Sequence, residues 1–126
     1  MAFRFHHVHI ICQDLDRMIT FFTKTLEADL IRRQKFGTAD GASLDLEGVT
    51  VNLRVAREDE QMTGDASMKC FGFDHIGVAV GDIDATHQDL TAQGYSFFMP
   101  PTDIPGLRIA FFKGPEDLTI ELVQEK

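Results

Sequence analysis

Histidine and acidic residues recur at matched places in the two halves of this 126-residue sequence. The first strand-like run holds three histidines around His7, and a later run holds His75. The offset from His7 to His75 is 68 residues, and the same offset separates Asp14 from Asp82. Imidazole and carboxylate groups bind divalent metal ions and transfer protons. The repeat therefore predicts two copies of one unit that bring such groups together.

Hydrophobic periodicity predicts a β-α-β-β-β order for the first half. A strand at 4–12 leads to Asp14 as helix N-cap, and apolar residues at helical spacing predict a helix over 15–26. The later elements are expected to be a short strand at 30–31, a polar loop marked by Gly37 and Gly41, and a hairpin of 43–47 and 49–55 around Gly48.

The second half repeats this order. A strand at 73–80, Asp82 as N-cap and a helix over about 83–93 with Gly94 as its stop are predicted first. A strand at 95–99 that ends at Pro100-Pro101, a turn at 105–106, and a hairpin of 108–113 and 118–123 complete the unit.

The fold class expected from these elements is α+β, with two β-α-β-β-β repeats that form a curled mixed sheet around a central cleft. Residues 1–126 are expected to be a single domain. We predict repeat one at 3–56, a polar joint at 57–71 and repeat two at 72–124.

Strand alternation decides which side chains face the cleft. If Val8 and Ile10 pack on the first helix, His7 and His9 face inward, and the same parity turns His75 inward. In the two closing strands the inward positions are Thr50, Asn52, Arg54, Thr119 and Glu121.

Glu121 is an inward carboxylate between Ile120 and Leu122, and burying it is costly unless it is paired or bound to a cation. His7, His75 and Glu121 would together supply a divalent-metal site. Two imidazoles and one carboxylate suit a first-row metal and leave positions open for substrate.

Three further residues are candidates for substrate binding: His9, Asn52 and Arg54. His9 could donate a hydrogen bond to a metal ligand, act as a proton shuttle or form a cavity wall, whereas His6 faces the other way. Arg54 could bind a substrate carboxylate or phosphate through its guanidinium, or it could form an internal salt bridge to Glu47 or another neighbouring acid.

Composition excludes several other classes. The net charge of −8 argues against a nucleic-acid partner, and no apolar run is long enough to span a membrane. The start lacks the apolar stretch of a secretion signal. Cys12 and Cys70 are the only cysteines and form no metal-binding pair. We expect a cytoplasmic protein with reduced, inert thiols.

The chain resembles the vicinal oxygen chelate superfamily, which includes glyoxalase I, methylmalonyl-CoA epimerase, extradiol dioxygenases and bleomycin-resistance proteins. His7-Val8-x-Ile10 with Asp14-Leu15-Asp16 looks like the family's first unit. His75-Ile76-x-Val78 with Asp82-Ile83-Asp84 looks like its second, and Leu118-Thr119-Ile120-Glu121-Leu122 looks like its closing strand.

By that resemblance, His7, His75 and Glu121 occupy metal-ligand positions. Asn52 stands where the glyoxalase and epimerase branches usually have Glu or Gln, and this favours three protein ligands over four. Glu27 stands where a Gly often follows the helix leucine.

The function implied is a divalent-metal-dependent lyase or isomerase that acts through a metal-stabilised enolate or enediolate of a small carbonyl substrate. Glu121 would also serve as catalytic base. The metal could be Zn, Ni, Co, Mn or Fe, and a homodimer is expected. One alternative is an Fe(II) extradiol-type dioxygenase, and another is a metal-free ligand-sequestering protein of the bleomycin-resistance type.

Overall fold

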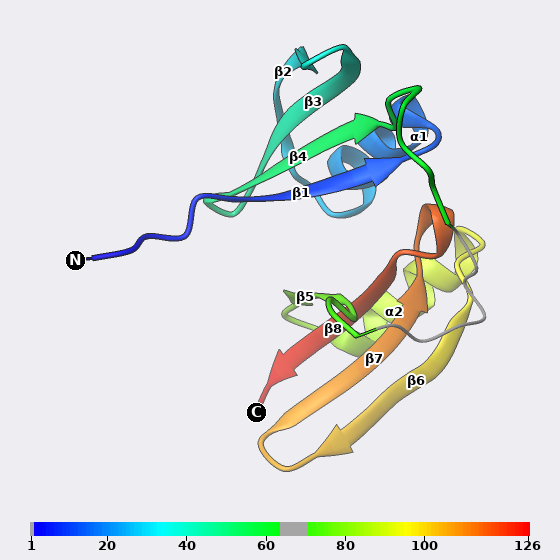
Figure 1. Cartoon of the computed structure of the whole chain (residues 1–126). Coiled ribbons are helices and arrows are strands. Elements are labelled where there is room, and N and C mark those ends of the chain that lie inside the picture. The colour runs from blue at the N-terminus through cyan, green and yellow to red at the C-terminus, as the bar shows by residue number, and fades with distance from the viewer. Residues whose placement is uncertain (1, 64–70) are drawn as a thin grey trace. The chain divides into compact units, whose positions relative to one another are not determined.

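A computed structural model describes residues 2–63 and 71–126 of the chain (Figure 1). The chain divides into two compact units, Met1–Gly64 and Asp65–Lys126. Part of the predicted joint, with Cys70, lies outside the described residues.

The first unit contains one four-stranded mixed sheet of strand order β1-β4-β3-β2. Strand β1 pairs with β4 in parallel, and the other pairs are antiparallel. Its elements are β1 (His7–Cys12), α1 (Leu15–Thr20), the π-helical turn η1 (Phe21–Thr25), β2 (Asp29–Phe36), β3 (Ala39–Leu46) and β4 (Val49–Val55).

The second unit repeats this topology with strand order β5-β8-β7-β6, in which β5 and β8 are parallel. Its elements are β5 (Ile76–Ala79), α2 (Ile83–Ala92), β6 (Phe97–Ile104), β7 (Leu107–Lys113), the 3-10 turn η2 (Pro115–Asp117) and β8 (Thr119–Glu125). The predicted α+β class with two β-α-β-β-β repeats is confirmed. The arrangement of both sheets around one cleft stays a prediction.

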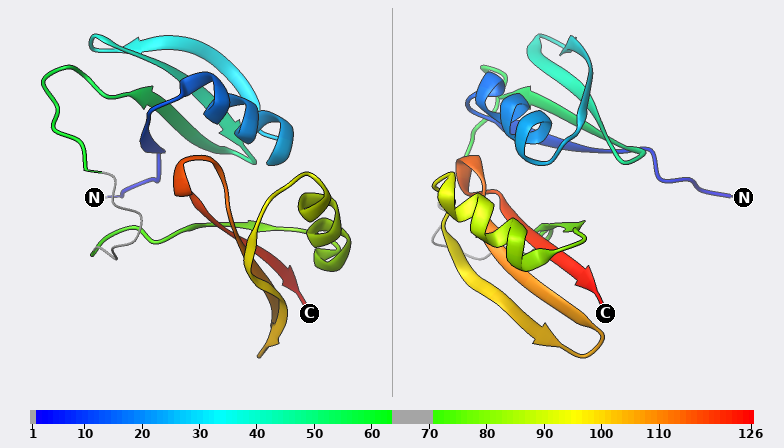
Figure 2. Two further views of the ribbon diagram at one scale, coloured as in Figure 1. Left: turned by 90° about the vertical axis from the view of Figure 1, so that its right-hand side faces the viewer. Right: turned by 180° about the vertical axis from the view of Figure 1, so that it is seen from behind.

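Each helix begins where the sequence predicts. The Asp14 carboxylate accepts a hydrogen bond from the Arg17 backbone N–H at 3.0 Å, and Asp82 accepts from the Ala85 N–H at 3.0 Å. These caps satisfy helix-end donors that have no partner within the helix. Each helix covers one face of its own sheet (Figure 2).

The buried core of the first unit lies between α1, η1 and the sheet. Met18 and Phe22 are almost fully buried, as are Leu44, Val51 and Leu53 on the strands. Along β1 the exposed residues alternate with more buried ones, and this is the alternation from which the histidine face was predicted.

The predicted helix over 15–26 is present, but its last turn is π-helical, with the Leu26 N–H bonded to the Phe21 carbonyl at 3.2 Å. Glu27 follows with a φ of 61°. This left-handed conformation favours glycine, which explains why a glycine is the expected residue there.

The prediction of a polar loop around Gly37 and Gly41 was wrong. Only residues 37 and 38 turn, and Gly41 lies within β3 opposite Arg54. Strands β2 and β3 form a long hairpin, closed by an ion pair of 2.7 Å between Lys35 and Asp40. The sequence did not predict this hairpin, because polar side chains on both strands interrupt the hydrophobic alternation that is typical of strands.

The predicted end of a strand at Pro100-Pro101 was also wrong, because β6 continues to Ile104. Proline is tolerated there because β6 is an edge strand, and its pairing with β7 shifts register between Met99 and Thr102.

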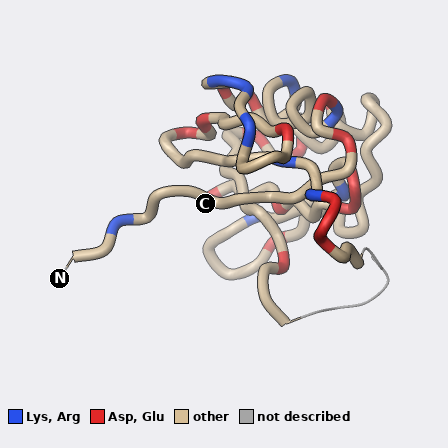
Figure 3. Tube along the Cα trace, turned by 45° about the horizontal axis from the view of Figure 1, so that its top comes forward, with Lys and Arg blue, Asp and Glu red and all other residues tan. Residues whose placement is uncertain are grey.

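None of the helices among the described residues is long and apolar enough to cross a membrane. Figure 3 shows Lys and Arg scattered among Asp and Glu along the trace.

Gly41 provides a test of the hairpin packing. A Cβ atom at Gly41 would overlap the Leu53 carbonyl oxygen and the Phe36 ring. We expect Gly41→Ala to lower the free energy of unfolding by about 1–3 kcal/mol through overpacking. Gly81→Ala is the control, since its added Cβ meets nothing within 4 Å and its φ is not left-handed. Denaturant unfolding gives the free energy of unfolding of both variants. An equal decrease in the two variants would contradict the close packing around Gly41.

Candidate metal centre

His75 and Glu121 meet in the second unit. His75 immediately precedes β5, and Glu121 lies on β8, the parallel neighbour of β5. Glu121 is the register partner of Gly77, so strand alternation places His75 on the same face. The distance from His75 Nε2 to Glu121 Oε1 is 3.1 Å. The structure thus brings together two of the three predicted metal ligands.

Asp74 orients the His75 ring. Its Oδ2 lies 2.8 Å from His75 Nδ1, so both ring nitrogens face carboxylate oxygens. The hydrogen bond to Asp74 is the main reason why the pKa of His75 is raised, and the charge of Glu121 adds to it. In metal sites, the ring nitrogen of a histidine ligand that faces away from the metal usually bonds to a carboxylate or carbonyl oxygen, which fixes the ring and its tautomer.

The donor atoms of this pair fit a divalent metal ion. An imidazole nitrogen and a carboxylate oxygen, each about 2.1 Å from one ion, stand about 3.0 to 3.4 Å apart at octahedral to tetrahedral angles. The observed 3.1 Å falls in that range. Within the described part of either unit, no three His, Cys, Asp or Glu side chains are placed to hold a metal. The third predicted ligand, His7, belongs to the first unit.

Aromatic rings lie beside this pair on the second sheet. Phe111 is the β7 register partner of Glu121 and meets the His75 ring edge-on, with centroids 5.1 Å apart. Phe98 stacks on Phe111 at 5.6 Å, and Lys113 Nζ lies 5.5 Å from the Phe98 centroid. Glu121 therefore lies next to an apolar surface.

In the first unit, His7 and His9 lie on one face of β1. His7 Nδ1 is 2.9 Å from Nδ1 of His6, and the His9 ring meets Phe36 with centroids 4.7 Å apart. Desolvation of His9, followed by the positive charge of Arg54, lowers the pKa of His9. A lowered pKa favours the neutral form of the His9 ring, in keeping with a role as a cavity wall or a hydrogen-bonding group.

Asn52 is held by a chain of hydrogen bonds. Ser43 Oγ donates to Asn52 Oδ1 at 2.6 Å, and Gln34 Nε2 donates to Ser43 Oγ at 2.5 Å. Ser43 is the register partner of Asn52 on β3, and His9 is its partner on β1. The Asn52 oxygen, the atom by which an amide binds metal, is thus occupied by a hydroxyl donor.

Arg54 forms a bidentate ion pair with Glu60, with nitrogen–oxygen distances of 2.7 and 2.8 Å. Arg54 is only 8% exposed. Of the two alternatives for Arg54, the structure shows the internal salt bridge, made to Glu60 rather than to Glu47. The Arg54 guanidinium, followed by the Arg57 backbone N–H, lowers the pKa of Glu60 to about 2. A substrate-binding role of Arg54 stays an untested prediction.

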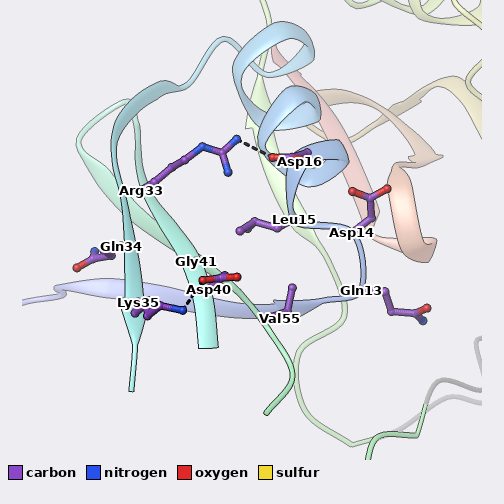
Figure 4. Close-up of a pocket in the computed structure, with 10 residues that line it drawn as sticks. All are labelled: Gln13, Asp14, Leu15, Asp16, Arg33, Gln34, Lys35, Asp40, Gly41 and Val55. Atoms are coloured by element: carbon purple, nitrogen blue, oxygen red, sulfur yellow. Dashed lines mark hydrogen bonds and ion pairs between the residues drawn. The ribbon is translucent and has the colours of Figure 1, made fainter. Parts of the chain in front are cut away.

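A separate open pocket of about 660 Å³ lies between the start of α1 and strands β2 and β3 (Figure 4). Its charged groups pair with one another, Arg33 with Asp16 at 2.6 Å and Lys35 with Asp40 at 2.7 Å. None of the predicted site residues lines it. The lining residues are Gln13, Asp14, Leu15, Asp16, Arg33, Gln34, Lys35, Asp40, Gly41 and Val55.

The sequence-based prediction missed several residues that hold the candidate residues in place. Asp74 directly precedes His75, so its position in the sequence was a sufficient signal. Ser43 could have been found by counting back from the turn at Glu47 and Gly48. Gln34 gave no signal, because its strand was predicted to be too short.

The fold belongs to a known class. Residues 4–122 match the family model described as the Glyoxalase/Bleomycin resistance protein/Dioxygenase superfamily. The chain is a member of this superfamily.

Individual relatives agree with this class. A probable lactoylglutathione lyase of Vibrio cholerae is 29% identical, covering 98% of this chain and 91% of that protein. A lactoylglutathione lyase of Arabidopsis thaliana is 28% identical over 96% of this chain and 44% of its own length. A solved domain of the superfamily from Frankia sp. shares the fold with a TM-score of 0.80 and 22% identity, covering 100% of this chain and 94% of its own.

The Arg54–Glu60 pair predicts a particular pH dependence of stability. Because folding lowers the pKa of Glu60 from 4.5 to about 2, the pair stabilises the fold above pH 4.5 and loses its effect as pH falls through 2. We expect Glu60→Gln to lower the melting temperature at pH 7 and to converge with the wild type near pH 2. Asp40→Asn, which removes an exposed pair, should have little effect. A difference in melting temperature between Glu60→Gln and the wild type that is the same at every pH would refute this explanation.

Proposed function

We propose that the protein is a divalent-metal-dependent lyase or isomerase of the glyoxalase kind that acts on a small carbonyl substrate. The observation that carries the proposal is the His75–Glu121 pair at 3.1 Å, with Asp74 behind the imidazole. The similarity to lactoylglutathione lyases supports the same reaction class.

In this proposal, His75 and Glu121 hold the metal together with His7, and Asp74 keeps the His75 ring oriented. When bound, the metal supplies a Lewis acid that stabilises negative charge next to a carbonyl carbon. Glu121 takes the proton from the hydroxyl-bearing carbon next to the carbonyl and returns it to the carbonyl carbon. The hydroxyl proton moves to the former carbonyl oxygen, so the substrate is isomerised without a redox change. The Phe111 ring, which meets the His75 ring, provides an apolar wall beside Glu121.

An Fe(II) extradiol-type dioxygenase is the second candidate. The Asn52 oxygen accepts the Ser43 hydroxyl, which leaves two histidines and one glutamate as the protein ligands. That set is typical of non-haem iron oxygenases. A metal-free sequestering protein is the third candidate, and it would need none of these residues.

Substitution of Glu121 tests the first candidate. In Glu121→Gln we expect Zn²⁺ affinity to fall by at least about tenfold, because a neutral amide is a weaker ligand than a carboxylate. Formation of lactoylglutathione from glutathione and methylglyoxal should fall by roughly 10²–10⁴ in kcat, because the base is lost. Glu125→Gln lies on the same strand and is exposed, so it serves as the control.

The metal content of protein purified without chelators separates the candidates. Bound Zn, Ni, Co or Mn with lyase activity supports the proposal. Bound Fe(II) with O₂ uptake on catechols favours the dioxygenase. Protein that stays metal-free, and whose properties His75→Ala leaves unchanged, refutes both enzymatic candidates.

We also propose that His7 completes the site from either the same chain or the partner subunit of a homodimer. Mixing His7→Ala with Glu121→Gln subunits distinguishes these cases. If the site is shared between subunits, each mixed dimer contains one intact set and Zn²⁺ binding recovers in part. If the site lies within one chain, each subunit of the mixed dimer lacks one metal ligand, and Zn²⁺ binding stays low.

A further inference from the structure

Asn52 and Glu121 occupy equivalent places in the two sheets, but their neighbours differ. Asn52 has Ser43 as its register partner on the adjacent antiparallel strand, and Glu121 has Phe111. Phe111 offers no hydrogen bond, so Glu121 turns to His75 at 3.1 Å. Ser43 offers a hydroxyl, and the side chain of Asn52 bonds to it. The residue opposite therefore determines which side-chain atoms Asn52 and Glu121 expose to a ligand.

The chain of hydrogen bonds has a direction. A serine hydroxyl has one proton to donate, and Ser43 Oγ already accepts from the Gln34 amide at 2.5 Å. Ser43 therefore donates to Asn52, whose Oδ1 is directed toward β3. The oxygen and nitrogen of an amide diverge from one carbon, so Nδ2 is directed away from β3, toward the side of β1 and His9.

The Asn52 nitrogen is available to a ligand. Asn52 Nδ2 forms no hydrogen bond to another described residue, and the described part of the chain has no buried side-chain nitrogen or oxygen without a partner. Although Asn52 is only 8% exposed, Nδ2 therefore keeps some contact with solvent. Beside it stands His9, the register partner of Asn52 on β1.

We infer that Gln34 and Ser43 are positioning residues that hold Asn52 as a hydrogen-bond donor on the histidine-bearing face of the first unit. Asn52 then contacts an oxygen acceptor of the substrate, such as a carbonyl or carboxylate oxygen, and stays outside the metal's coordination shell. The part of this inference that concerns substrate rests on the proposed function.

The substitution Gln34→Glu tests the direction of the chain with little change in shape. A glutamate at this position only accepts, so the Ser43 hydroxyl turns toward it and accepts from Asn52 Nδ2 instead. Asn52 would then present its oxygen to the ligand. Lys35→Gln is the control, because it makes the same change in net charge one residue along the strand, in an exposed ion pair.

The first measurement needs neither metal nor substrate. The side-chain amide protons of Asn52, assigned in ¹⁵N-labelled protein with Asn52→Asp, should exchange with water at least about fivefold more slowly in Gln34→Glu than in the wild type or Lys35→Gln. Equal exchange, or slower exchange in the wild type, overturns the assigned direction.

The second measurement follows lactoylglutathione formation and Zn²⁺ binding. We expect Gln34→Glu and Asn52→Ala each to raise KM about tenfold, the effect of one lost hydrogen bond, with kcat within about threefold. The double variant should be no worse than Asn52→Ala alone, because Gln34 acts through Asn52. Zn²⁺ affinity should stay within about twofold in Asn52→Ala.

A tenfold loss of Zn²⁺ affinity in Asn52→Ala would make Asn52 a metal ligand and overturn the inference. An undiminished effect of Gln34→Glu in the Asn52→Ala background would overturn the positioning role. If the wild type binds none of Zn²⁺, Ni²⁺, Co²⁺ and Mn²⁺, the proposed function fails, and the amide-exchange measurement alone decides the inference.

Discussion

The parallel pairing of the first and last strands is the interaction on which each unit depends. It places β1 against β4 and β5 against β8, so residues at the two ends of a unit become neighbours. His75 and Glu121 are 46 positions apart in the sequence and still meet. Because strand side chains alternate with a period of two, a slip of one residue would bury Glu121 against α2 and expose Ile120. The packing of the helix and the geometry of the site are thus set by the same register.

The two units use this common frame for different chemistry. In the second unit, Phe111 lies beside the histidine and the glutamate, and Phe98 stacks on Phe111. The first unit uses serine, glutamine and asparagine in a neutral hydrogen-bonded chain. The repeat in the sequence therefore conserves strand order and register, while the residues on the histidine-bearing faces have diverged.

The sequence alone predicted the features that depend on the preferences of neighbouring residues along the chain. The capping residues Asp14 and Asp82 and the alternation along β1 follow from spacing alone. It was insufficient where pairing overrides local preference, as in β6, whose prolines are tolerated only because the strand lies at an edge. The partner of Arg54 was equally hidden, because Glu60 lies beyond the hairpin in a polar segment with no periodicity.

The neutral amide of Asn52 also affects the charge balance of the proposed site. One glutamate and two neutral imidazoles carry a single negative charge, which would leave a divalent cation with one positive charge uncompensated. A second carboxylate at position 52 would cancel it. A neutral amide there would keep the proposed centre electrophilic, and an anionic ligand would then restore neutrality beside the apolar ring of Phe111.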